Sequence, residues 1–278
     1  MDAFAQTDVG CRRTVNQDAY FLDTESRVFI VADGMGGHQA GDLASRLAIR
    51  AIIDFMNQQV HFDADEQSIV DRLAIERELC RSAIVCANNE VYQVAEEHPE
   101  LFGMGTTIDM IKVVDGYAVI CHVGDSRIYR IADGNIRQIT KDHTQIQELI
   151  DQHQITEEEA QYSTMKNVIT RALGGSEDVE VDTIILPIRL MDVFLLCTDG
   201  LSGVMEDWEL KEEFGMYDCD IKEAVKGYIQ TTLDRGAPDN VTVLIAGPAD
   251  ETDCLSAEEE AANAEALIET FGDVYFTD

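Results

Sequence analysis

Two stretches of the chain carry apolar residues at helical spacing. Each has one apolar face, made of Ala44, Leu47, Ala48, Ala51, Ile52 and Phe55 in the first and of Cys80, Ala83, Ile84, Ala87, Val91 and Val94 in the second. Apolar positions three and four residues apart share one face of an α-helix, and that face needs a covering partner in water. The pattern therefore predicts two amphipathic helices, each lying on a β-sheet.

After Phe102 the pattern changes to short runs typical of β-strands. The predicted strands are residues 106–114, 117–123, 127–131 and 136–139. Asp115-Gly116 separates the first two and Asp133-Gly134 the last two, and Asp-Gly is a preferred two-residue hairpin turn. This part of the chain is predicted to form an antiparallel meander.

Other segments complete the outline. Residues 145–167 are polar, rich in Gln and Glu and without a strong apolar face, which predicts a surface excursion or lid. Residues 217–233 and 256–270 are predicted helices, the second with Ser256 and Glu259 at the spacing of a capping box, and residues 240–246 a buried strand. We expect one large domain over residues 1–248 and an acidic tail over 249–278.

The chain of 278 residues is strongly acidic. Twenty Lys and Arg stand against 54 Asp and Glu, giving a net charge of −34, and residues 249–278 contain ten acidic residues and no Lys or Arg. This surplus argues strongly against nucleic acid or an anionic membrane as a partner, and leaves cationic partners and metal ions open. The share of hydrophobic residues, 45%, is that of an ordinary globular protein.

Cysteine use and the first residues indicate a cytoplasmic protein. The seven Cys are scattered without a CxxC pair, so neither a disulfide framework nor a thiolate zinc site is signalled. The first ten residues include two Asp and form no basic, apolar leader, and no apolar run is long enough to span a bilayer.

Four aspartates lie at or near the ends of predicted strands. Asp33 and Asp199 each begin an Asp-Gly pair that follows a continuous apolar run, Val28 to Ala32 and Val193 to Cys197, which predicts a buried strand. Asp125 and Asp239 offer two further carboxylates. A carboxylate at the end of a buried strand is costly to desolvate unless a cation or hydrogen bonds compensate it. Taken singly, each Asp is explained by capping its own backbone. Taken as a set, the four favour Mg²⁺ or Mn²⁺, which prefer hard oxygen ligands, over Zn²⁺.

Eight short motifs occur in a characteristic order. They are Arg13-x-x-Asn16-Gln17-Asp18, Val31-Ala32-Asp33-Gly34-Met35-Gly36-Gly37-His38, Gly105-Thr106-Thr107, Gly124-Asp125-Ser126-Arg127, Thr140-Lys141-Asp142-His143, Ile169-Thr170-Arg171-Ala172-Leu173-Gly174, Cys197-Thr198-Asp199-Gly200-Leu201 and Asp239-Asn240-Val241-Thr242. This series resembles that of the metal-dependent protein Ser/Thr phosphatases, the PPM or protein phosphatase 2C-like family, in its bacterial form. The resemblance covers the whole chain apart from the tail.

The resemblance implies an α+β fold, an αββα sandwich of two antiparallel β-sheets flanked by helices, with a metal centre at one edge. By similarity, Asp33 would bridge two Mn²⁺ or Mg²⁺ ions, the Gly34 carbonyl would help hold the first, and Asp199 and Asp239 would hold the second. Asp125 and Asp199 match positions that bind a third, weaker ion. Two such ions would activate a bridging water to attack the phosphorus of phosphoserine or phosphothreonine.

Three further residues receive roles by similarity. Arg13 would bind the substrate phosphate through its guanidinium fork, and Asp18 would hydrogen-bond a metal-bound water. The proton donor to the leaving group is open, because Met35 stands where eukaryotic relatives carry His. His38, three residues on, is the nearest His, and water is the alternative acid. His143 is assigned a structural role because it closes a strand.

The sequence therefore predicts a bacterial-type protein Ser/Thr phosphatase that acts on phosphorylated proteins and opposes a Ser/Thr kinase, with a flap at about residues 144–168 bordering the active site. In that flap Tyr162-Ser163-Thr164-Met165 replaces the His-Pro pair common in bacterial relatives. Two alternatives stay open. One is a pseudophosphatase that binds and regulates a partner, and the other is a metal-dependent phosphoesterase acting on small molecules.

Overall fold

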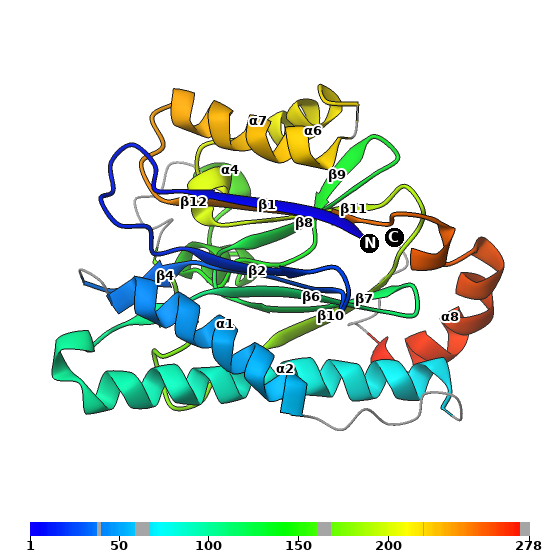
Figure 1. The fold of residues 1–278 in the computed structure, drawn as a ribbon, viewed down its shortest axis with the longest axis horizontal. Coiled ribbons are helices and arrows are strands. Elements are labelled where there is room, and N and C mark those ends of the chain that lie inside the picture. The colour runs from blue at the N-terminus through cyan, green and yellow to red at the C-terminus, as the bar shows by residue number, and fades with distance from the viewer. Residues whose placement is uncertain (38–39, 59–66, 161–167, 219, 273–278) are drawn as a thin grey trace.

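The computed structural model describes residues 1–37, 40–58, 67–160, 168–218 and 220–272. Over these residues two five-stranded antiparallel sheets lie face to face, and helices cover the outer face of each sheet (Figure 1). The predicted αββα sandwich is confirmed. None of the described helices combines the length and apolarity needed to cross a membrane.

The strands divide between the two large sheets and a small one. The first sheet has the order β1 (Asp2–Asp8), β12 (Val241–Gly247), β11 (Val193–Cys197), β8 (Arg127–Ala132) and β9 (Asn135–Gln138). The second has the order β10 (Asp182–Pro187), β7 (Tyr117–Val123), β6 (Ile108–Val114), β3 (Val28–Ala32) and β2 (Ala19–Asp23). β4 (Gly34–Met35) and β5 (Gly105–Thr106) form a separate two-stranded pair.

The helices form two outer layers. The second sheet is covered by α1 (Ala40–Gln58) and α2 (Ile69–Glu97), and the first by α6 (Asp207–Gly215) and α7 (Ile221–Asp234) (Figure 1). The shorter helices are η2 (Pro99–Leu101), α3 (Gln145–Asp151), α4 (Glu157–Ala160), α5 (Asp199–Ser202) and η3 (Glu251–Asp253), and α8 (Ala257–Phe271) follows the last strand. Both helices predicted from apolar faces in the N-terminal third are therefore confirmed.

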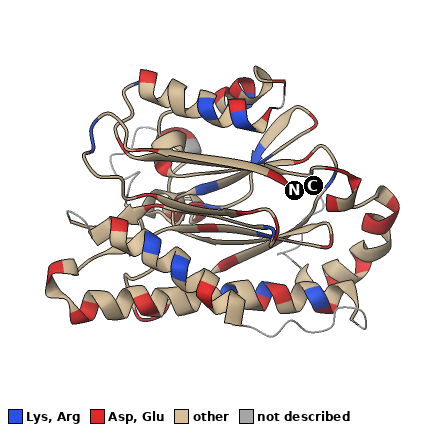
Figure 2. Cartoon of the chain, in the orientation of Figure 1, with Lys and Arg blue, Asp and Glu red and all other residues tan. Residues whose placement is uncertain are grey.

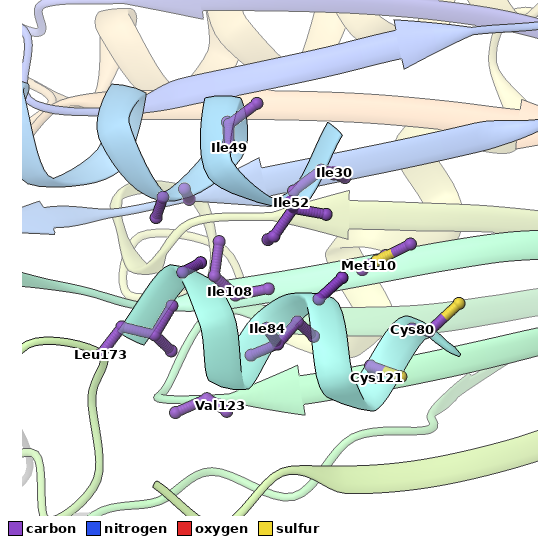
Figure 3. Close-up of a cluster of buried hydrophobic side chains, with 14 of the residues drawn as sticks. Ile30, Ile49, Ile52, Cys80, Ile84, Ile108, Met110, Cys121, Val123 and Leu173 are labelled. Atoms are coloured by element: carbon purple, nitrogen blue, oxygen red, sulfur yellow. The ribbon is translucent and has the colours of Figure 1, made fainter. Parts of the chain in front are cut away.

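The core explains why the central strands are apolar throughout. In β3, Ile30 faces α1 and α2, whereas Phe29 and Val31 face the opposite sheet. Ile49 and Ile52 of α1 and Ile84 of α2 belong to the buried cluster that these helices form with this sheet (Figure 3). Because helices cover one face and a second sheet covers the other, both alternating sets of side chains are buried and no polar period is left.

One sequence prediction is wrong in part. β6 and β7 form a hairpin and so do β8 and β9, with Asp115-Gly116 and Asp133-Gly134 at positive φ in the two turns, as predicted. The two hairpins belong to different sheets, so they are not one meander. The chain crosses between the sheets at Gly124, which has φ +120° and whose added Cβ would lie 2.5 Å from Thr107 Cγ2. Only glycine fits this crossover.

Residues beyond β12 pack against the sandwich. Ser256 and Glu259 form the predicted capping box at the start of α8. Leu267 and Phe271 of this helix are buried in the cluster that includes α2, and Arg77 of α2 lies 5.1 Å from the Phe271 ring centroid. α8 lies at the right end of Figure 1, whereas β4 lies at the left end. Acidic positions occur on α8 and on helices of both outer layers (Figure 2).

Candidate active site

The aspartates singled out in the sequence come together because of strand direction. In an antiparallel sheet, the start of one strand lies beside the end of its neighbour. In the first sheet, Asp199 follows the end of β11, while Asp125 and Asp239 precede the starts of β8 and β12. In the second sheet, Asp33 follows the end of β3 and Asp18 precedes the start of β2. All five therefore lie at one end of the sandwich.

Hydrogen bonds fix the backbone of Asp33. Its amide donates to Thr107 Oγ1 over 2.9 Å, and its carbonyl accepts from the Thr107 amide and the Thr106 hydroxyl, both at 2.9 Å. Thr107 Oγ1 also shares a 2.7 Å hydrogen bond with Ser126 Oγ in the crossover. Ser126 therefore links the crossover to Thr107, and no side-chain hydrogen bond between Ser126 and another described residue involves a His.

Gly34 is required by a close approach of two loops. A Cβ on Gly34 would lie 2.1 Å from the Gly41 carbonyl oxygen and 2.5 Å from that of Gln17. The Gly34 amide donates to the Gln17 carbonyl over 3.2 Å, and the Gly34 carbonyl lies against Gly41. The Asp33-Gly34 turn is therefore clamped between the Arg13–Asp18 motif and the start of α1. His38 lies outside the described residues.

The carboxylates carry more negative charge than the protein compensates. Burial, and then repulsion from Asp18 and Asp199, raises the pKa of Asp33 well above its usual range. Burial and the neighbouring Asp239 likewise raise the pKa of Asp199, and burial and Asp199 raise that of Asp125 to about 7. Such a cluster fits divalent cations, which would offset the repulsion and which accept carboxylate oxygen as ligand.

The two carboxylate oxygens of Asp18 differ in their hydrogen bonding. Its Oδ2 accepts hydrogen bonds from Thr198 Oγ1 at 2.9 Å and from Thr242 Oγ1 at 2.7 Å. Its Oδ1 is buried and has no hydrogen-bond partner among the described residues. Burial raises the pKa of Asp18 to about 7 against the lowering effect of the two hydroxyls. A buried acceptor without a partner is costly, and a water or cation at this position would satisfy it.

Arg13 brings the positive charge of the site. Its Nη2 donates to Asp239 Oδ2 over 2.7 Å, and 52% of its side chain remains exposed. The ion pair with Asp239, followed by the weaker attraction of Asp199 and Asp33, raises the pKa of Arg13. The guanidinium is therefore placed beside the carboxylates with room for a further anionic partner.

These residues open onto a cleft of about 630 Å³. Arg13, Asp125, Asp199 and Asp239 line one part of it. The flap and the segment after α5 line another part, with Thr144, Ile146, Gln147, Ile150, Ala160, Gly203, Val204 and Glu206. At its floor Arg127 makes a two-pronged ion pair with Asp142, with nitrogen–oxygen distances of 2.7 to 3.1 Å. Asp33 and Asp18 are not among the residues that line the cleft.

Across the described residues, no three His, Cys, Asp or Glu side chains form a closed ligand cluster. Mg²⁺ and similar hard cations keep several waters and are held by only one or two carboxylates each, so a closed protein cage is not expected here. The donor chemistry and the raised pKa values, rather than a preformed cage, are what fit these ions.

Sequence reasoning did not find every residue that shapes this end of the molecule. His122 is fully buried, with its Nδ1 2.6 Å from Asp109 Oδ1 and its Nε2 2.9 Å from the Lys141 carbonyl oxygen. His143 lies beside it, at a ring centroid separation of 4.6 Å. The position of His122 inside an apolar strand is the one signal that could have indicated a partnered histidine.

Clustered carboxylates that fit divalent cations, beside an arginine that fits a phosphate, form the site chemistry of a metal-dependent phosphoric ester hydrolase. The family model described as protein phosphatase 2C matches residues 11–241. The chain belongs to the protein phosphatase 2C family and is a protein phosphatase by that membership, which confirms the resemblance drawn from the eight motifs.

Curated relatives and solved structures agree. The serine/threonine phosphatase stp of Listeria monocytogenes is 36% identical over 248 residues, which cover 88% of this chain and 95% of that protein. The serine/threonine protein phosphatase PstP of Mycobacterium tuberculosis is 37% identical over 246 residues, or 88% of this chain and 45% of PstP. The crystal structure of the PstP catalytic domain in complex with two manganese ions has a TM-score of 0.76 at 35% identity, covering 90% of this chain and 98% of that one.

Proposed function

We propose that this chain is a metal-dependent protein serine/threonine phosphatase that hydrolyses phosphoserine and phosphothreonine in proteins. The observation that carries the proposal is the group of Asp33, Asp125 and Asp199, next to the exposed face of Arg13. The pKa of each of these carboxylates is raised by burial and by repulsion from a neighbouring carboxylate. Manganese bound to the PstP catalytic domain supports the same metal chemistry here.

We propose the following metal ligands. Asp33 and the Gly34 carbonyl would hold the first ion, with Asp33 also reaching the second, and Asp199 and Asp239 would hold the second. Asp125 and Asp199 would hold a third, weaker ion. When bound, Mn²⁺ or Mg²⁺ supplies a water of lowered pKa as nucleophile and neutralises phosphate charge.

Side chains of the protein would bind the phosphate, orient a water and protonate the leaving group. Arg13 binds two phosphate oxygens with the guanidinium edge that its bond to Asp239 leaves exposed. Asp18, held through Oδ2 by two threonine hydroxyls, presents Oδ1 to orient a water. We keep His38 as the candidate proton donor to the leaving alkoxide, with water as the alternative acid.

The setting of the enzyme is part of the proposal. We propose phosphorylated proteins as substrates, a bacterial Ser/Thr kinase as the opposing enzyme, and the cytoplasm as the location. The six described cysteines are all free thiols, as expected in a reducing compartment. Residues 1–248 would form the catalytic unit and residues 249–278 an acidic addition to it.

The test is the initial rate of hydrolysis of a phosphothreonine peptide with EDTA, Mg²⁺ or Mn²⁺, comparing the wild type with Asp239→Asn. Metal-dependent turnover that the substitution removes supports the proposal. Absence of turnover with every metal, on both the peptide and an aryl phosphate, would instead support the pseudophosphatase. Faster hydrolysis of free phosphometabolites than of phosphoproteins would support the small-molecule esterase.

A further inference from the structure

A row of charged side chains crosses the second sheet at its active-site end. Asp182 of β10 and Asp109 of β6 are the direct cross-strand neighbours of His122 in β7. Asp109 and His122 are both fully buried. Each His122 nitrogen lies within hydrogen-bond distance of an oxygen, Asp109 Oδ1 or the Lys141 carbonyl, and an imidazolium beside the Asp109 carboxylate satisfies both contacts. The raised pKa of His122, which Asp109 causes against the effect of burial, agrees with this charge.

His143 lies against this row and connects it to the crossover between the sheets. Its Nδ1 accepts a hydrogen bond from the Gly124 amide at 3.0 Å, and its own amide donates to the Gly124 carbonyl at 2.7 Å. Its Nε2 is 3.1 Å from Asp182 Oδ2. Gly124 directly precedes Asp125, so His143 holds the backbone that carries this carboxylate through both peptide groups of Gly124.

The hydrogen bonds define the tautomer of His143. The Gly124 amide can only donate, so Nδ1 carries no proton and the proton of the neutral ring is on Nε2. Nε2 lies between an acceptor, Asp182 Oδ2 at 3.1 Å, and Arg171 Nη1 at 2.9 Å. A charged ring would place an N–H against the Gly124 N–H. Burial lowers the pKa of His143, which favours the neutral form that this geometry needs. Hydrogen bonds from His143 and Arg171 lower the pKa of Asp182 to about 2, against the effect of burial.

The flap starts directly after His143. Thr144 and Ile169 form an antiparallel bridge at the flap base, and the Thr170 amide donates to the His143 carbonyl at 2.9 Å. Arg171, on the returning segment, donates to Asp182 Oδ1 at 2.6 Å. The cleft-lining residues of the flap therefore start one residue after His143, at Thr144, the N-cap of α3, and hydrogen bonds tie both ends of the flap to His143.

We propose that His143 is a positioning residue that sets Asp125 and the two ends of the flap in one arrangement, so that cation binding at Asp125 and recognition of a phosphoprotein in the cleft depend on the same side chain. This inference rests on the proposed function, because it concerns how that cleft is assembled. A merely structural histidine would contribute to stability and to nothing else.

Two substitutions separate the two hydrogen bonds of His143. The Oδ1 atom of Asn takes the place of Nδ1 and can accept from Gly124 but cannot reach Asp182. The terminal amide of Gln takes the place of Nε2 and can donate to Asp182 but leaves Gly124 without its acceptor. His143→Phe keeps the ring contact with His122 and loses both bonds. Glu180→Gln is the control, since Glu180 is an exposed partner of the same Arg171.

The first measurement is an EPR titration with Mn²⁺ alone, which reports binding without turnover. We expect His143→Gln and His143→Phe to weaken the weakest class of Mn²⁺ sites about tenfold, the scale seen when a ligand loses the group that orients it. His143→Asn and Glu180→Gln should bind Mn²⁺ as the wild type does.

The second measurement is KM for a phosphothreonine peptide and for an aryl phosphate at saturating Mn²⁺. We expect His143→Asn and His143→Phe to raise KM for the peptide several-fold and to leave KM for the aryl phosphate unchanged. If a His143 variant does not fold, Asp182→Asn replaces it, with the same expected rise in peptide KM.

The proposal is overturned if all His143 variants match the wild type in Mn²⁺ affinity and in the ratio of the two KM values, even when their urea midpoints fall. It is also overturned if Asn and Gln behave alike in the EPR titration. Should the wild type itself show no turnover, the proposed function fails, and the EPR comparison still decides the role of His143 at Asp125.

Discussion

Arg13 and Asp239, which both line the cleft, form an ion pair, although the first is proposed to hold phosphate and the second a cation. The pair joins the loop after β1 to the start of β12 through a 2.7 Å bond between Nη2 and Oδ2. Neither side chain is fully buried, so the bond is screened by water and leaves both groups able to take a stronger partner. The ion pair therefore holds the proposed phosphate-binding residue, Arg13, directly beside the proposed cation ligand, Asp239.

Replacing Arg13 should therefore affect substrate more than metal. We expect Arg13→Ala to lower kcat/KM for a phosphothreonine peptide about 100- to 1,000-fold, the range typical of losing one charge-stabilising donor in an active site. Mn²⁺ affinity should be equal or higher, because Asp239 loses its competitor. Arg12→Ala changes the neighbouring exposed arginine and is the matched control. Steady-state kinetics and Mn²⁺ titration of the two variants would test this. If Arg13→Ala lost as much Mn²⁺ affinity as kcat/KM, the prediction would be contradicted.

Asp199→Asn should separate activity from stability. The carboxylate has a raised pKa because burial and Asp239 disfavour its charge. The neutral, equally shaped Asn removes that repulsion, so we expect the variant to have a higher Tm than the wild type in EDTA. Its activity at saturating Mn²⁺ should fall by about 100-fold or more.

The control for this substitution is Asp133→Asn, because Asp133 is exposed at a hairpin turn with a positive φ that Asn tolerates. It should leave Tm and turnover unchanged. Wild-type turnover in Asp199→Asn would remove this residue from the proposed ligands.

The metal-free protein should become less stable as the pH rises. Folding raises the pKa values of Asp18 and Asp125 to about 7, so the folded state binds more protons than the unfolded chain above about pH 4. The stability that this binding contributes is complete below about pH 4 and is lost as the pH rises through 7. Asp182, with a pKa of about 2, loses its own contribution only at much lower pH.

Urea denaturation in EDTA at several values between about pH 5 and pH 8 would measure this dependence. We expect the midpoint to fall with rising pH in the wild type and to fall less in Asp125→Asn. Saturating Mn²⁺ should weaken the trend, because a cation offsets the same charges. A midpoint that rises steadily over this range would show that these carboxylates are compensated.

The sequence predicted the elements whose signal is local. The apolar faces of α1 and α2 are long enough to be recognised from residue spacing alone. The turns at Asp115-Gly116 and Asp133-Gly134 are each determined by two adjacent residues. The edge strands β1 and β2 were missed, because their residues are mostly half-buried and show no regular alternation. The assignment of β7 and β8 to different sheets was also missed, because only tertiary packing around Gly124 decides it.

The residues of the candidate site also divide into those with a local sequence signal and those without one. Asp33 and Asp199 could be found because each follows a fully apolar strand, which makes a carboxylate conspicuous. The pairing of His122 with Asp109 could not, because it depends on the register of β6 against β7 and on which face of that pair is covered. Asp182 carried no signal at all, since its role comes from β10 adding to the other edge of β7.

The last prediction concerns the residues beyond β12. Leu267 of α8 is fully buried against the layer of α1 and α2, while 52% of its neighbour Ile268 is exposed. We expect Leu267→Ala to lower the free energy of unfolding by about 2 to 5 kcal/mol and Ile268→Ala by much less, because only the first leaves a cavity. Urea denaturation of the two variants measures the difference directly.

Turnover should respond differently from stability. α8 lies at the opposite end of the sandwich from β4 and Gly34, so kcat on an aryl phosphate, per folded molecule, should be unchanged in Leu267→Ala (Figure 1). Deletion of residues 249–278 should lower stability further, because it also removes the 2.9 Å ion pair between Asp253 and Arg27. A fall in kcat for Leu267→Ala under conditions where it is fully folded would mean that α8 acts on the cleft through α2, and that residues 249–278 belong to the catalytic unit.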